Sequence, residues 1–131
     1  FSETLKKNGV KCIDYIWNTK QRTEEYHQRM NKLFDEYPEM DAMFSEDLII
    51  MNALKCAGER GMCIPDEFKA VGYDGTLIAK ISYPSMTYVS QPIKELADIL
   101  VDVLLKKING AKLHEDIILK DVCLVKGQTT E

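Results

Sequence analysis

Segments with the apolar spacing of amphipathic helices alternate with short apolar, strand-like segments along this chain. Between residues 23 and 37, for example, Tyr26, Met30 and Leu33 recur at intervals of three and four, the spacing of one helical face. The expected elements are helix 1–8, strand 12–17, helix 23–37, strand 42–44, helix 48–59, strand 68–73, strand 86–91, helix 92–108 and strand 116–125. Consecutive parallel strands need a crossover, which a helix supplies. We therefore predict an α/β fold with a mostly parallel, doubly wound sheet and helices on both faces.

The length of the chain indicates one domain, and its net charge limits the kinds of partner that it can bind. Its 131 residues suit one domain, and 45% hydrophobic with 29% charged residues is a globular composition. The formal net charge of −4 argues against a basic, nucleic-acid-binding surface, so DNA contact is expected only outside this chain. There is no run of about 18 apolar residues and no signal peptide. Because the chain starts at Phe1 without a methionine, inside an expected helix, we expect a fragment.

Cysteine and histidine usage argues against a metal site. The four cysteines are scattered without a Cys-x-x-Cys pair, and there are only two histidines. This pattern predicts no zinc, and reduced thiols in a cytoplasmic protein. His27 in an amphipathic helix and His114 in a charged loop are expected at the surface, without a nucleophile beside them. We therefore expect no enzyme activity, no metal and no cofactor.

The stretch from residue 64 to residue 76 combines a turn, a short apolar strand and a carboxylate. Pro65 fixes its φ angle, so the chain enters the strand from a defined loop. Asp74 ends the strand, and Gly72 and Gly75 leave room around it for unusual backbone angles or a close neighbour. Ligands of open α/β sheets bind beyond the carboxyl ends of the strands, so Asp74 is the expected functional centre. The alternative is that Asp74 only caps the next turn.

Polar and aromatic side chains follow three of the predicted strands. They are Trp17 and Asn18 after the first strand, Glu46 and Asp47 after the second, and Asp74 after the third. Carboxylates accept hydrogen bonds from vicinal hydroxyls and rings cover the apolar face of a sugar, so this set predicts a site for a polyhydroxylated ligand. Asp47 is expected to cap the following helix and Glu46 to contact the ligand. Trp17 has two open roles, a sugar platform or a core residue.

Several short motifs together resemble one protein family. They are residues 42–47 (Ala-Met-Phe-Ser-Glu-Asp), 64–66 (Ile-Pro-Asp), 71–74 (Val-Gly-Tyr-Asp), 83–92 (Tyr-Pro-Ser-Met-Thr-Tyr-Val-Ser-Gln-Pro) and 124–130 (Leu-Val-Lys-Gly-Gln-Thr-Thr), with Ala53, Leu54 and Gly61 between them. In this order and spacing, over essentially the whole chain, they look like the effector-binding half of the lac repressor (LacI/GalR) family. Residues 72–76 and 91–93 in particular resemble repressors of sucrose-type operons.

The resemblance implies a two-lobed, type I periplasmic-binding-protein-like core, with a helix-turn-helix domain and a hinge upstream of this chain. Residues 1–90 would then form the C-terminal lobe, truncated at its start, residues 91–115 would belong to the N-terminal lobe, and residues 116–131 would return to the C-terminal lobe. Such proteins are cytoplasmic homodimers that bind operator DNA and a small saccharide effector. The implied function is effector binding and dimerisation in a bacterial repressor of carbohydrate uptake or metabolism.

The resemblance also implies roles for individual residues. The implied effector-binding residues are Asp74, Glu46, Trp17, Asn18 and Gln91, where Gln91 begins a crossing between the lobes. The implied dimer interface lies on helix 48–59 and comprises Ile49, Ile50, Asn52 and Ala53. Two departures matter: the family more often has Asn-Asp at residues 46–47, and its effector-stacking aromatic residue aligns closer to Lys20 than to Trp17.

Two other functions stay open on the sequence. An exported sugar-binding receptor of the same fold would have a signal peptide upstream, where a repressor has a helix-turn-helix domain. Glu46 and Asp74 could also be the carboxylate pair of a glycoside hydrolase. No further acid or nucleophile in the sequence supports that enzyme.

Overall fold

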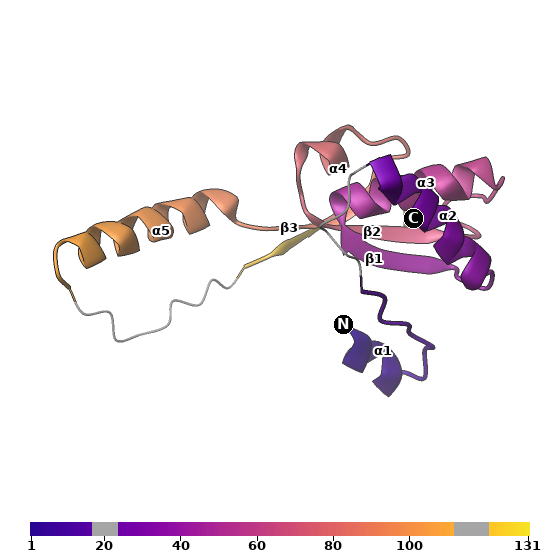
Figure 1. The fold of residues 1–131 in the computed structure, drawn as a ribbon, viewed down its shortest axis with the longest axis horizontal. Helices are drawn as coiled ribbons and strands as arrows, with labels where there is room; N and C mark the ends of the chain where they lie inside the picture. Colours follow the sequence, from indigo (N-terminus) through magenta and orange to yellow (C-terminus); the bar gives the residue numbers. More distant parts are fainter. Residues whose placement is uncertain (17–23, 112–120) are drawn as a thin grey trace.

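The computed structural model describes residues 1–16, 24–111 and 121–131 (Figure 1). The elements are α1 (Ser2–Lys7), α2 (Glu24–Glu36), β1 (Ala42–Glu46), α3 (Asp47–Glu59), β2 (Lys69–Asp74), α4 (Leu77–Ile81), β3 (Thr87–Ser90), α5 (Ile93–Ile108) and β4 (Cys123–Val125). The four predicted helices are all present as α1, α2, α3 and α5, with ends that differ by only a few residues.

A four-stranded sheet in the order β1-β2-β3-β4 forms the centre of the fold. The first three strands are parallel, and β4 pairs antiparallel with β3. The prediction of an α/β fold with a mostly parallel sheet is therefore confirmed. The register aligns Glu46 with Tyr73 and Asp74 with Ser90, so β1, β2 and β3 end at the same edge of the sheet.

The core lies where α3 packs on one face of this sheet and α2 packs beside α3 (Figure 1). Met30 of α2 and Ile50 of α3 are fully buried, as is Phe68, which precedes β2. The rings of Phe34 and Phe68 form a tilted pair with centroids 5.2 Å apart. Ala70, the small buried residue of β2 on this face, lets the helix come close to the sheet. The core therefore joins both helices to the central strand.

The strand predicted at residues 12–17 is not formed, since residues 10–16 adopt neither helix nor strand. Trp17 and Asn18 lie outside the described residues. In the described part of the chain β1 is the edge strand on this side of the sheet, and residues 10–16 together with β1 line a cavity of about 940 Å³. Paired strands must lie about 5 Å apart. The segment therefore lies along the cavity without pairing with β1, although its composition favours a strand.

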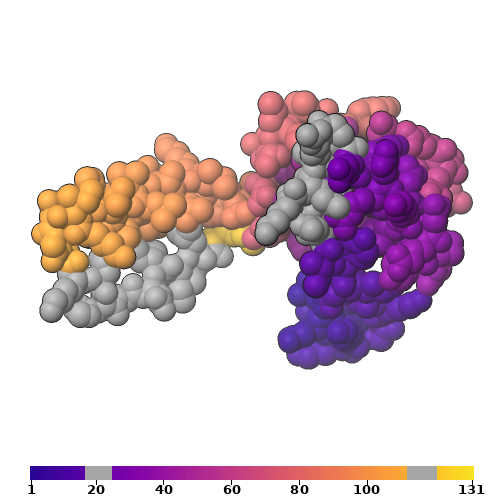
Figure 2. Space-filling view, viewed as in Figure 1, coloured from indigo at the N-terminus to yellow at the C-terminus, as the bar shows by residue number. Residues whose placement is uncertain are grey.

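α5 projects as an arm from the rounded body of the molecule (Figures 1 and 2). No residue of this helix is buried. Its apolar stripe includes Ile93, Leu100, Leu104 and Ile108, which are between 57% and 70% exposed. Among the helices of the described ranges, none has the length and apolarity needed to cross a membrane. The apolar face of α5 is thus left uncovered by the described part of the chain.

We expect Phe68→Ala to lower the free energy of unfolding by about 3–5 kcal/mol, because the ring is completely buried and its loss leaves a cavity beside Phe34. Lys32→Ala, an exposed change on α2, is the control and should stay within about 0.5 kcal/mol of the wild type. Chemical denaturation followed by circular dichroism measures both. Equal losses for the two variants would contradict the packing described for this core.

Candidate functional site

The edge at which the parallel strands end brings together three of the five predicted effector-binding residues. Glu46 is the last residue of β1 and Asp74 the last residue of β2. Gln91 follows β3 directly. Trp17 and Asn18 lie outside the described residues, so their roles remain predictions. Two carboxylates and one amide therefore lie side by side at one sheet edge.

Asp74 has an unusual backbone conformation that a second residue holds in place. Its φ angle is 112°, in a region where a residue with a β-carbon is strained by about 1–3 kcal/mol. The side-chain amide of Gln91 donates to Asp74 Oδ1, and the backbone N–H of Gln91 donates to the Asp74 carbonyl at 3.4 Å. Both contacts join the ends of β2 and β3. Gln91 therefore fixes the direction of the half-buried Asp74 carboxylate.

Gly75 is needed directly after Asp74 for two reasons. Its φ angle of 69° lies in the left-handed region that favours glycine. In addition, a β-carbon at this position would lie 2.9 Å from the ring of Tyr88 and 3.0 Å from Ser90 Oγ. Gly75 therefore makes room for Tyr88 and Ser90 and supplies the backbone angle that follows Asp74.

Of the two acidic residues at the start of α3, only Asp47 departs from its predicted role. Glu46 occupies the N-cap position of α3, but its exposed side chain makes no capping hydrogen bond to the described residues. Asp47 was expected to be the cap. It is instead the first helical residue, with a side chain 1% exposed that points toward the chain after β2. The prediction of a capping Asp47 is wrong because Thr76 competes successfully for its carboxylate.

The Asp47 carboxylate fastens the β2–α4 connection to the start of α3. Thr76 donates its backbone N–H at 2.6 Å and its hydroxyl at 2.8 Å, both to Asp47 Oδ2. The other oxygen, Oδ1, is buried without a hydrogen-bond partner in the described part of the chain. A β-carbon on Gly72 would lie only 2.5 Å from this oxygen and 2.6 Å from Met86 Sδ. Gly72 is thus required by the buried carboxylate rather than by Asp74.

Aromatic rings lie on the face of the sheet opposite α3. Phe44 and Tyr73 meet edge to face, with centroids 6.0 Å apart, and Phe1 lies 4.7 Å from Phe44. Phe44 also lines the cavity of about 940 Å³, together with Val71 and Val89 of the neighbouring strands. Rings beside carboxylate and amide groups can bind a molecule that has both apolar faces and hydroxyls.

The outward face of α3 differs from the predicted dimer interface. Ile49, Ile50 and Ala53 are at most 4% exposed and pack in the core of their own chain, so they have almost no surface to give to a partner. This part of the prediction is wrong, because the apolar residues of α3 serve the sheet first. Asn52 remains partly exposed, and its amide donates to the Leu48 carbonyl at 2.9 Å.

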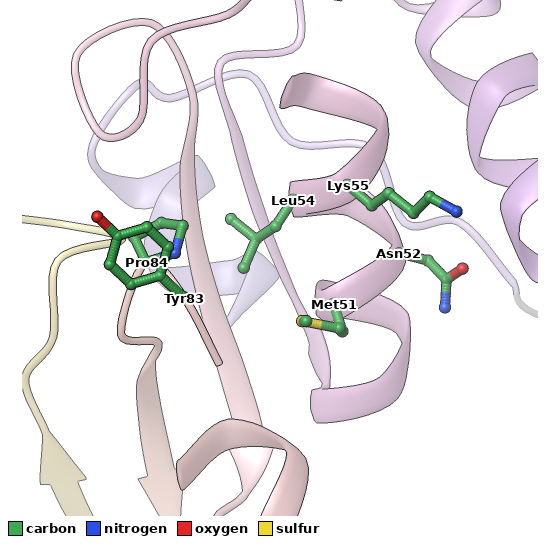
Figure 3. Close-up of a pocket in the computed structure, with 6 residues that line it drawn as sticks. All are labelled: Met51, Asn52, Leu54, Lys55, Tyr83 and Pro84. Atoms are coloured by element: carbon green, nitrogen blue, oxygen red, sulfur yellow. The ribbon is translucent and has the colours of Figure 1, made fainter. Parts of the chain in front are cut away.

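Asn52 lines a hollow of about 330 Å³ between α3 and the loop before β3 (Figure 3). Figure 3 shows Tyr83 and Pro84 of the loop opposite Leu54 and Met51 of the helix. Tyr83 is 90% exposed. An exposed aromatic ring next to apolar helix residues is typical of a protein contact surface.

Comparisons with known proteins agree on one family. A family model for the periplasmic binding protein-like domain matches residues 1–130. The chain is 42% identical over 90 residues to the sucrose operon repressor of Streptococcus mutans, covering 68% of this chain and 28% of that protein. It is 34% identical over 114 residues to the ribose operon repressor of Halalkalibacterium halodurans, covering 86% and 34%.

Among solved structures, the chain is similar to the lac repressor dimer bound to operator and the anti-inducer ONPF, with 25% identity and a TM-score of 0.80. The match covers 98% of this chain and 45% of that one. The chain thus spans about a third or less of the length of the two curated relatives. These similarities confirm the resemblance to LacI/GalR proteins and the periplasmic-binding-protein-like fold.

We expect Asp47→Ala to lower the free energy of unfolding by about 1.5–3 kcal/mol, because two hydrogen bonds to a charged acceptor are lost and the Thr76 N–H is left unpaired. Thr76→Val removes only the hydroxyl bond and should cost about 0.5–1.5 kcal/mol. Denaturant titration of both variants tests this order. An Asp47→Ala variant as stable as the wild type would show that the buried carboxylate does not hold the β2–α4 connection.

Proposed function

Because this chain belongs to the periplasmic binding protein-like domain family, we propose that it is the effector-binding and dimerisation part of a bacterial repressor of carbohydrate uptake or metabolism. The sequence similarity to sucrose and ribose operon repressors supports this class of protein. In the whole protein, a helix-turn-helix domain outside the chain binds operator DNA, in keeping with the net charge of −4.

The observation that carries the proposal is the Asp74–Gln91 contact at the sheet edge. The Gln91 amide donates a hydrogen bond to Asp74 Oδ1. The second carboxylate oxygen, Oδ2, is therefore the acceptor for a sugar hydroxyl. Glu46 adds a second carboxylate on the neighbouring strand, exposed and not used as a cap. Tyr73 and Phe44 lie beside these acceptors as an apolar wall. Converging acceptors next to rings suit a saccharide or sugar phosphate.

The exposed stripe of α5 supports a division of the chain between two lobes. Residues 1–90 belong to the C-terminal lobe, residues 91–115 to the N-terminal lobe, and residues 116–131 return to the C-terminal lobe. Gln91 lies at the first crossing, so one residue both contacts Asp74 and begins the segment that leads to the other lobe. Effector binding between the lobes would then act directly on the connection.

The similarities favour a repressor over the two alternatives. The matched relatives are named as operon repressors and transcriptional regulators rather than as exported receptors or hydrolases. These names support a role in which the carboxylate pair Glu46 and Asp74 binds a sugar without cleaving it, as expected of a regulator rather than an enzyme.

We expect Asp74→Asn to weaken saccharide binding by about 10–100-fold without changing the fold, because the nearly isosteric change removes a charged acceptor worth about 1.5–3 kcal/mol. Isothermal titration calorimetry of the full-length repressor with sucrose, and with ribose and maltose if sucrose gives no heat, measures it. Asp66→Asn, in the exposed turn before β2, is the matched control. Wild-type affinity in Asp74→Asn would remove this residue from the site.

We also expect a homodimer whose contact includes Asn52 and the neighbouring hollow at Tyr83. Asn52→Arg places a bulky charge there and should split the dimer. Gln28→Arg makes the same chemical change on exposed α2 and should leave it intact. Light scattering of the full-length protein at micromolar concentration gives the mass. A dimeric Asn52→Arg variant would place the interface elsewhere.

A further inference from the structure

Three different metal-binding side chains meet where α2 packs on α3, far from the strand edge. His27 comes from α2, and Cys56 and Glu59 lie one helical turn apart on α3. Cys56 Sγ is 3.3 Å from His27 Nδ1, and Glu59 Oε2 is 3.0 Å from His27 Nε2. One ligand atom from each residue lies within 4.8 Å of the other two. The cluster thus contains sulfur, nitrogen and oxygen donors within reach of one another.

The cluster is buried at one end and open at the other. Cys56 is fully buried, the His27 side chain is 30% exposed, and the Glu59 side chain is 47% exposed. An ion can therefore reach the imidazole and the carboxylate from solvent and take the thiol as its innermost ligand. The prediction that no nucleophile lies beside His27 is wrong, because the Cys56 thiol comes from another helix, 29 residues away in the sequence.

We propose that His27, Cys56 and Glu59 form a binding site for Zn²⁺ or a chemically similar divalent ion. Cysteine, histidine and carboxylate are the usual zinc ligands, at about 2.3, 2.0–2.1 and 2.0–2.2 Å, with water able to complete a tetrahedron. Those bond lengths separate the sulfur and nitrogen ligands by about 3.5 Å. The observed 3.3 Å between Sγ and Nδ1 needs only a small adjustment.

The remaining ligand requires Glu59 to move from one side of the imidazole to the other. Glu59 is the last residue of α3 and half-exposed, so its side chain can turn from Nε2 toward an ion held by Nδ1 and Sγ. Asn31, whose amide nitrogen lies 3.3 Å from Nε2, then becomes the partner of that ring nitrogen. For this its oxygen turns to the ring N–H and leaves the Arg60 guanidinium, from which it accepts at 3.2 Å. An amide can present either its oxygen or its nitrogen to the ring. Asn31 would thereby orient the ring as metal-bound histidines require.

The charges around the cluster allow a cation to bind. Lys55 lies 3.9 Å from Glu59 and is mostly exposed, and the Arg60 guanidinium is already paired with Asp35 at 2.7 Å. Burial and the Glu59 carboxylate raise the pKa of the Cys56 thiol, so the thiol keeps its proton without a metal. Binding then exchanges one proton for the ion: the S–H bond breaks, a Zn–S bond forms, and the proton passes to solvent. No oxidant or reductant is involved.

Cobalt titration of the full-length, fully reduced protein tests the site, because thiolate-bound Co²⁺ absorbs in the near ultraviolet. We expect one Co²⁺ per chain, with this absorption, displaced by Zn²⁺. Cys56→Ser should abolish the absorption, whereas Cys63→Ser and Cys123→Ser, which alter exposed cysteines, should keep it. His27→Gln and Glu59→Gln should weaken binding by about 10–100-fold.

Thermal unfolding separates a folding defect from a lost ligand. The wild type should unfold at a higher temperature with equimolar Zn²⁺ than with a chelator, and the variants at His27 and Glu59 should lose most of that difference. If Cys56→Ser fails to fold, the variants at His27 and Glu59 still test the site. Thiolate absorption that survives in Cys56→Ser, or an unchanged unfolding temperature in the wild type, would overturn the proposal.

Discussion

The hydrogen bonds from Thr76 to the buried Asp47 carboxylate are the contact on which the candidate site depends. They join the beginning of α3 to the chain after β2, two regions that are 29 residues apart. Asp74 lies two residues before Thr76 and keeps a strained φ angle of 112°. Such strain persists only where both flanks are held. Asp47 holds the flank after Asp74, and Gln91 holds the carboxylate itself, so the direction of this carboxylate is determined by two strands and a helix.

α3 contributes residues to the strand edge, to the hollow at Tyr83 and to the cluster with His27. Its first residue, Asp47, holds the strand edge, its middle lines the hollow at Tyr83, and its last turn carries Cys56 and Glu59. Between them its apolar residues pack on the sheet. The strand edge, the proposed dimer face and the helix pair with His27 are therefore all attached to this one helix of 13 residues.

The sequence predicted those parts of the fold that depend on local spacing. Helical periodicity located α2, α3 and α5, and the alternation of elements predicted a mostly parallel sheet that places Glu46, Asp74 and Gln91 at one edge. The errors concern contacts between distant residues. Residues 12–16 have strand composition but line a cavity with β1 instead of pairing with it, and Asp47 has the composition of a cap but a better donor in Thr76. Both outcomes depend on residues far away in the sequence, so a short window of sequence could not predict them.

The same reasoning explains why apolar spacing identified α5 but could not reveal its neighbour. Ile93, Leu100, Leu104 and Ile108 form a regular stripe, yet each is more than half exposed. Burying one such side chain is worth about 1.5–3 kcal/mol, so the four together exceed what a helix can leave in water without a partner. The opposite face of the sheet, with Phe44 36% exposed, has the same property. An amphipathic sequence therefore predicts that an apolar face packs against something. Which segment or chain packs there depends on the rest of the assembled protein.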